Sequence, residues 1–105
     1  GAFFLTDDLE PSPLIDCDSN LPDALIEAED DYNVARVRIA AEEDILELLS
    51  CAAVCHLPTA IYTDNALLLD RTLQCYPGRL LVDSVCEIEK PLLEDIAAQY
   101  GAIVF

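Results

Sequence analysis

The chain has 105 residues, the length of one globular domain, and 53% of them are hydrophobic, which excludes a disordered chain and predicts a buried core. Its 21 acidic residues outnumber five basic ones, for a formal net charge of -16. Because phosphate groups repel such a chain, this charge argues against nucleic-acid binding and against binding to anionic membrane surfaces.

Five short apolar segments are predicted to be strands, and their starts recur about every 21 to 24 residues. A strand, a helix and two turns need about this length, so the period indicates repeated strand–helix units. An additional extended segment, Ala2 to Thr6, is expected to pair at a sheet edge or to continue a linker. The five predicted strands are 13–15, 34–39, 59–62, 79–85 and 102–105.

The first two predicted helices follow the first two strands. Ser19 or Asn20 is expected to cap the first helix, and Pro22 lies in its opening turn. The second helix is predicted over 41–56, before Pro58 starts the next strand. Apolar residues at helical spacing predict the buried faces, which would contain Leu21, Ala24, Leu25, Ala28, Ile45, Leu48, Leu49, Ala52 and Ala53.

The third and fourth helices have equally clear boundaries in the sequence. Asp64 or Asn65 is expected to cap the third helix, and Pro77-Gly78 ends it. The fourth helix begins near Lys90-Pro91 and stops at Gly101. The predicted buried faces contain Leu68, Leu69, Thr72, Leu73, Leu92, Leu93, Ile96 and Ala97.

These units predict an α/β fold with a mostly parallel sheet, in a single domain over residues 1–105. The helices would either cover one face, as in half of a TIM barrel, or both faces of an open three-layer sheet; the sequence does not choose. In the second strand Arg36 and Arg38 share one face. That strand therefore lies at an edge, or it turns two guanidinium groups toward acidic neighbours.

Polar residues where the predicted strands end are the candidate ligand-binding residues, because parallel α/β folds bind ligands at the carboxyl ends of their strands. An arginine between carboxylates would be held in place by charge pairing. The alternative interpretation is that these residues cap the helices that follow. The candidates are Asp16, Arg38, Tyr62, Asp64, Asn65, Asp83 and Ser84.

The sequence predicts no metal site, and it assigns no catalytic residue. Cys51, Cys55 and His56 lie close together, but zinc sites need three or four converging ligands and this chain has one histidine. The five cysteines are odd in number and form no C-x-x-C pair, so free thiols in the cytoplasm are expected. With three glycines, no phosphate-binding glycine loop is possible.

Two segments carry a resemblance to a known family. The run 58–65 and the run 76–85, which contains Tyr76-Pro77-Gly78 and a strand ending in Asp83-Ser84, are similar to the pterin-binding barrel of methionine synthases and folate–corrinoid methyltransferases. The run 99–104 is similar to the next unit of that barrel, so the match covers about half of the chain. Tyr62 stands where that family has an aspartate, and Asp83 stands where it has an asparagine.

The resemblance implies an accessory, non-catalytic domain of a homocysteine methyltransferase, because a whole barrel needs about 250 residues. The chain would then be the C-terminal domain of a longer protein, with the methyltransferase domain upstream as its partner. Folate or cobalamin would belong to the parent protein. Two alternatives are a domain that binds a folate-like molecule at the strand ends and a structural module that forms a homodimer.

Overall fold

The computed structural model describes residues 10–53, 56–76, 80–83 and 86–104. These residues form one all-parallel sheet with the strand order β1-β2-β3-β4-β5, and four helices alternate with the strands. The predicted α/β class is confirmed. The strands are β1 Ile15–Asp16, β2 Ala35–Arg38, β3 Thr59–Tyr62, β4 Leu81–Val82 and β5 Ile103–Val104, and the helices are α1 Leu21–Asp31, α2 Glu42–Cys51, α3 Ala66–Cys75 and α4 Lys90–Gln99.

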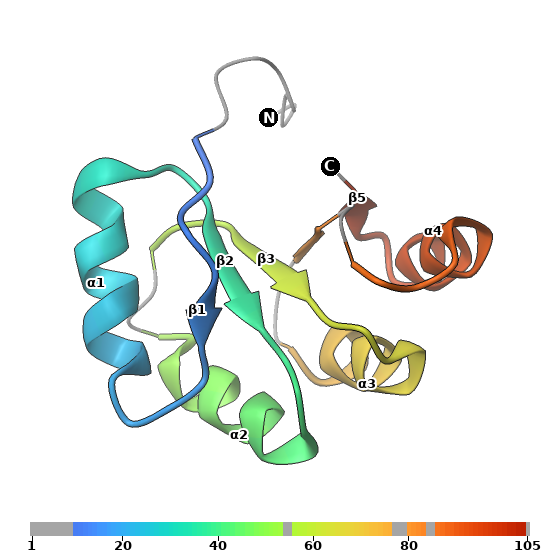
Figure 1. The fold of residues 1–105 in the computed structure, drawn as a ribbon, viewed down its shortest axis with the longest axis horizontal. Helices are drawn as coiled ribbons and strands as arrows, with labels where there is room; N and C mark the ends of the chain where they lie inside the picture. Colours follow the sequence, from blue (N-terminus) through green and yellow to red (C-terminus); the bar gives the residue numbers. More distant parts are fainter. Residues whose placement is uncertain (1–9, 54–55, 77–79, 84–85, 105) are drawn as a thin grey trace.

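The four helices of the described chain lie on one face of the sheet, and Figure 1 shows them along its outer side. Strands that are consecutive in the chain are also neighbours in the sheet. Right-handed connections between them therefore place every helix on the same side of the sheet. This arrangement is the half-barrel alternative. A three-layer sheet would require the chain to reverse direction across the sheet, which this strand order does not do.

The main core fills the space between the helices and the sheet. Alternate residues of the strands, such as Val37, Ile61 and Val82, point into it and are fully buried. From the helices come side chains such as Leu25 and Leu69, both with no exposed surface. A smaller apolar cluster lies on the other face of the sheet and consists of Val34, Ala60 and Leu81, with Ile103 packed against it.

Some details of the helices differ from the sequence predictions. Helix α2 ends at Cys51 rather than at His56, and Ala53 is exposed. The α-helical pattern ends in a tighter turn, in which the N–H of Ala52 donates to the carbonyl oxygen of Leu49, three residues back, at 3.3 Å. Leu92 is 45% exposed, not buried.

The buried face of α4 explains the position of Leu92. That face consists of Leu93, Ile96 and Ala97, which follow the three-and-four spacing of a helix, so Leu92 lies about 100° away from it. The end of α4 is as predicted. Gly101 has a φ of 69°, and the N–H of Ala102 donates to the carbonyl oxygen of Ala97 at 2.8 Å.

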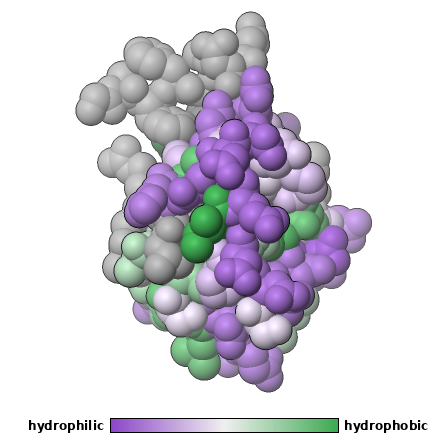
Figure 2. Space-filling view, turned by 90° about the vertical axis from the view of Figure 1, so that its left-hand side faces the viewer, coloured by the Kyte–Doolittle hydropathy of each residue, from purple (hydrophilic) through white to green (hydrophobic). Residues whose placement is uncertain are grey.

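Figure 2 shows the side of the molecule that carries α1, which is mostly hydrophilic with small, separate hydrophobic areas. Large exposed apolar side chains in the described residues occur singly, one on each helix: Ile26, Leu46, Leu67 and Leu92. None of the described helices is long and apolar enough to cross a bilayer.

Candidate functional site

Strand β2 lies inside the sheet, between β1 and β3, and its two arginines point to the face that carries no described helix. Of the two expectations for this strand, acidic neighbours are correct and an edge position is wrong. Nε of Arg36 donates to Oδ2 of Asp83 at 2.7 Å. Asp83 is 4% exposed, so this ion pair is largely removed from water and holds β2 to the end of β4.

The second arginine lies nearer the carboxyl end of the sheet and is more exposed. The strand register places Arg38 directly between Asp16 and Tyr62. Its Nε is 3.5 Å from Oδ1 of Asp16, and its guanidinium carbon is 5.9 Å from the centre of the Tyr62 ring. Both charged side chains are about half exposed or more, so their ion pair holds Arg38 only weakly.

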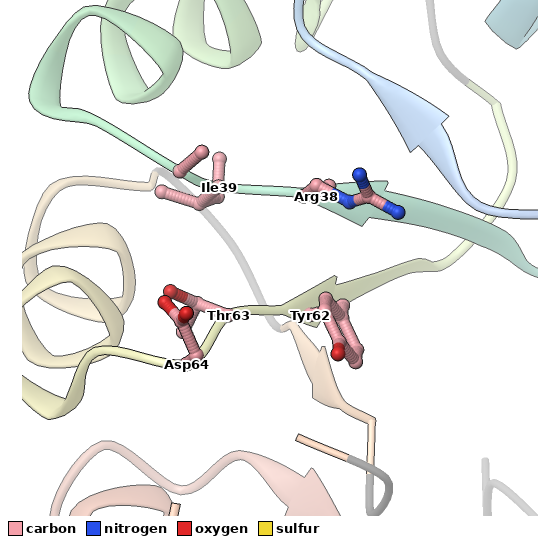
Figure 3. Close-up of a pocket in the computed structure, with 6 residues that line it drawn as sticks. Arg38, Ile39, Tyr62, Thr63 and Asp64 are labelled. Carbon is pink, nitrogen blue, oxygen red and sulfur yellow. The ribbon is translucent and has the colours of Figure 1, made fainter. Parts of the chain in front are cut away.

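A cleft of about 380 Å³ opens where β2 and β3 end. Figure 3 shows the Arg38 guanidinium and the Tyr62 ring toward one end of it, and the side-chain oxygens of Thr63 and Asp64 toward the other. Ile39 and Ala40 complete the lining. The cleft therefore offers a cation, an aromatic face and acceptor oxygens within one small space.

The structure divides the predicted site residues into groups. Arg38, Tyr62 and Asp64 line the cleft, and Asp16 adjoins it through Arg38. Asp83 is buried against Arg36 and does not line the cleft. Ser84 lies outside the described residues, and Asn65 has the capping role described next.

Asn65 is the N-cap of α3, as the alternative interpretation predicted. Its Oδ1 accepts hydrogen bonds from the backbone N–H groups of Leu67 at 2.9 Å and Leu68 at 3.2 Å. Asn65 is thereby assigned to the helix rather than to a ligand. Its own N–H donates to Oγ1 of the buried Thr63, which ties the end of β3 to the start of α3.

Replacing Asn65 with alanine is expected to lower the free energy of unfolding by about 1 kcal/mol, because two backbone donors lose their acceptor. Urea unfolding monitored by circular dichroism would measure this change. The control is Asp64→Ala at the neighbouring exposed position, with an expected change below about 0.5 kcal/mol. Equal losses from the two substitutions would contradict the capping role.

Two thiols lie near the carboxyl ends of the strands, Cys17 after β1 and Cys86 after β4. Sγ of Cys17 donates to the carbonyl oxygen of Arg38 at 3.4 Å. Burial, with the nearby carboxylate of Asp44, raises the pKa of Cys17 from 9.0 to about 12. Cys86 is buried, accepts from the N–H of Thr63 at 3.3 Å, and its pKa is also raised, chiefly by burial. Both thiols therefore stay protonated near neutral pH and are poor nucleophiles.

Iodoacetamide is expected to label Cys17 far more slowly in the folded protein than in the unfolded chain. A rise in pKa from 9.0 to about 12 lowers the thiolate fraction at pH 8 by roughly a thousandfold. Mass spectrometry of tryptic peptides after timed labelling, in buffer and in about 8 M urea, would measure the ratio of the two labelling rates. Labelling at equal rates in the two states would show that Cys17 is not held in this environment.

Some residues of the site were not among the sequence candidates. Arg36 was not, although its position two residues before Arg38 already placed it on the same face. Ile39 was also absent from the candidate set, and only the cleft between two strand ends identifies it. Within the described residues, no group of three possible metal ligands comes together.

No protein-family model, curated protein or solved structure matches this chain. The kinship with methionine synthase-type barrels stays a prediction.

Proposed function

We propose that this domain binds a small molecule of the folate type in the cleft at the ends of β2 and β3 and does not itself catalyse a reaction. The observation that carries the proposal is the pairing of Arg38 with the Tyr62 ring at the border of that cleft. The cleft volume of about 380 Å³ falls within the range of known ligand pockets, roughly 300–1,000 Å³.

The lining matches the parts of such a ligand. A planar ring can stack on Tyr62, whose side chain is half-buried and held at the end of β3. A carboxylate of the ligand can form a paired hydrogen bond with the Arg38 guanidinium, whose ion pair with exposed Asp16 is long, at 3.5 Å. Ring N–H groups can donate to the carboxylate of Asp64.

A binding role suits the chemistry of this rim better than a catalytic one. The raised pKa values of Cys17 and Cys86 keep both thiols protonated. Arg36 is committed to the buried ion pair with Asp83, so it contributes to the sheet rather than to the cleft. What the cleft presents are groups that orient and hold a ligand.

Calorimetric titration with methyltetrahydrofolate is expected to give measurable heat, and Tyr62→Leu and Arg38→Gln should each raise the dissociation constant about tenfold. A lost stacking contact or charge-assisted hydrogen bond costs about 1–2 kcal/mol. The matched control is Arg71→Gln on α3, an exposed arginine that pairs with Glu42 instead. No heat at millimolar ligand would end this proposal.

The second candidate function is docking within a methyltransferase of the methionine synthase type. Its support is the half-barrel itself: consecutive parallel strands with helices on one face. The partner would be the upstream domain of the same chain or a second copy, in a reducing cytoplasm. If the full-length protein keeps its assembly state and its activity after deletion of residues 1–105, this candidate is wrong.

A further inference from the structure

We propose a second binding site, separate from the cleft at the ends of β2 and β3. This site is the groove between β1 and α1, and it binds an extended peptide segment with basic residues at alternate positions. The groove has a volume of about 210 Å³. Leu14 and Ile15 form its strand side, and Ala24 and Ala28 form its helix side. Small alanines on the helix leave room for a chain to lie between the two elements.

The strand side of the groove is a sheet edge. In the described part of the chain, β1 pairs with β2 alone, so its outer side can take another strand. Pro13 lacks an N–H and removes one donor from this edge. Backbone pairing is therefore confined to a few residues around Ile15, and recognition depends mainly on side chains in the groove.

The helix side supplies the selectivity for charge. Glu27 and Asp31 line the groove four residues apart, so they are neighbours on one face of α1, with Cβ atoms about 5–6 Å apart. Alternate side chains of an extended peptide are about 7 Å apart on one face, which matches this spacing. Neither carboxylate belongs to an ion pair formed by the described residues.

The net charge also decides between possible occupants. A second copy of this chain also has a net charge of -16, and it would approach a groove lined by two carboxylates. Electrostatic repulsion therefore opposes self-association at the groove. A cationic segment is attracted by the same field. We therefore infer a foreign basic strand rather than a homodimer at this edge.

The test is fluorescence anisotropy with a labelled peptide of alternating lysine and valine, titrated with the 105-residue protein at low salt. Binding is expected, and E27Q/D31N should raise the dissociation constant about three- to tenfold, as the loss of two exposed ion pairs implies. The matched control, E94Q/D95N, removes two exposed carboxylates from α4 and should change the dissociation constant less than about twofold. Hydrogen exchange should show slower exchange at Ile15 when the peptide is present.

Three results would overturn the proposal. No binding of the lysine–valine peptide at millimolar protein excludes the site. Equal weakening by the two double variants means that the peptide senses only the overall charge. A dimer in analytical ultracentrifugation that E27Q/D31N strengthens or dissolves assigns the groove to a second copy instead. Failure of methyltetrahydrofolate to bind would contradict only the proposed site in the cleft at the ends of β2 and β3, so the two proposals are tested separately.

Discussion

Replacing Arg36 with methionine is expected to lower the free energy of unfolding by about 2–3 kcal/mol. The substitution removes the guanidinium that Asp83 contacts, so the carboxylate of Asp83, which is 4% exposed, loses one of the groups that stabilise its charge. The range lies below the usual cost of breaking a buried pair because the Arg36 side chain is 24% exposed and is partly solvated already. Methionine fills a similar volume, so little of the loss comes from a cavity.

Arg38→Met is the matched control for this experiment. It is the same substitution on the same face of β2, two residues further along, but the Arg38 side chain is 48% exposed and its partner Asp16 is 65% exposed. The expected change is below about 1 kcal/mol. Urea unfolding at neutral pH measures both variants, and equal effects would show that the Arg36–Asp83 contact is not a buried pair.

A double-mutant cycle isolates the contact between the two side chains. Asp83→Asn alone is expected to cost about 1 kcal/mol, because the amide still offers an acceptor and Arg36 still reaches water. The double variant R36M/D83N should be more stable than the sum of the single effects implies, by about 1–2 kcal/mol. Strict additivity would mean that the two groups act separately.

Replacing Leu69 with alanine is expected to cost about 3 kcal/mol of stability, because the side chain has no exposed surface and its removal leaves a cavity in the main core. The resulting fall in melting temperature is at least roughly 10 °C for a domain of this size. Thermal unfolding followed by circular dichroism measures it.

Leu67→Ala provides the control within the same helix. Leu67 lies two residues before Leu69 on α3 and is 60% exposed, so the same chemical change should alter stability by less than about 0.5 kcal/mol. Both substitutions change helix propensity equally, so the difference between them reports burial alone. A large effect at Leu67 and a small one at Leu69 would mean that α3 packs on the sheet with another face.

Local patterns in the sequence determined the secondary structure and the class of fold. Alternation within 34–39 placed Arg36 and Arg38 on one face, and the three-and-four spacing in α3 predicted the burial of Leu68 and Leu69. The recurrence of strands about every 21 to 24 residues predicted a parallel sheet. The spacing within each strand or helix depends on residues within one or two turns of each other, and the strand period depends only on the order of these segments along the chain.

Only the tertiary structure decided which elements lie next to each other, and the candidate site depends on that. Arg36 pairs with Asp83 across 47 positions of sequence, because the strand order places β2 and β4 on either side of β3. The register of β2 and β3 puts Arg38 beside Tyr62, whereas Asp83 pairs with Arg36 and does not line the cleft. Contacts between distant residues depend on how whole strands align, which no local spacing encodes.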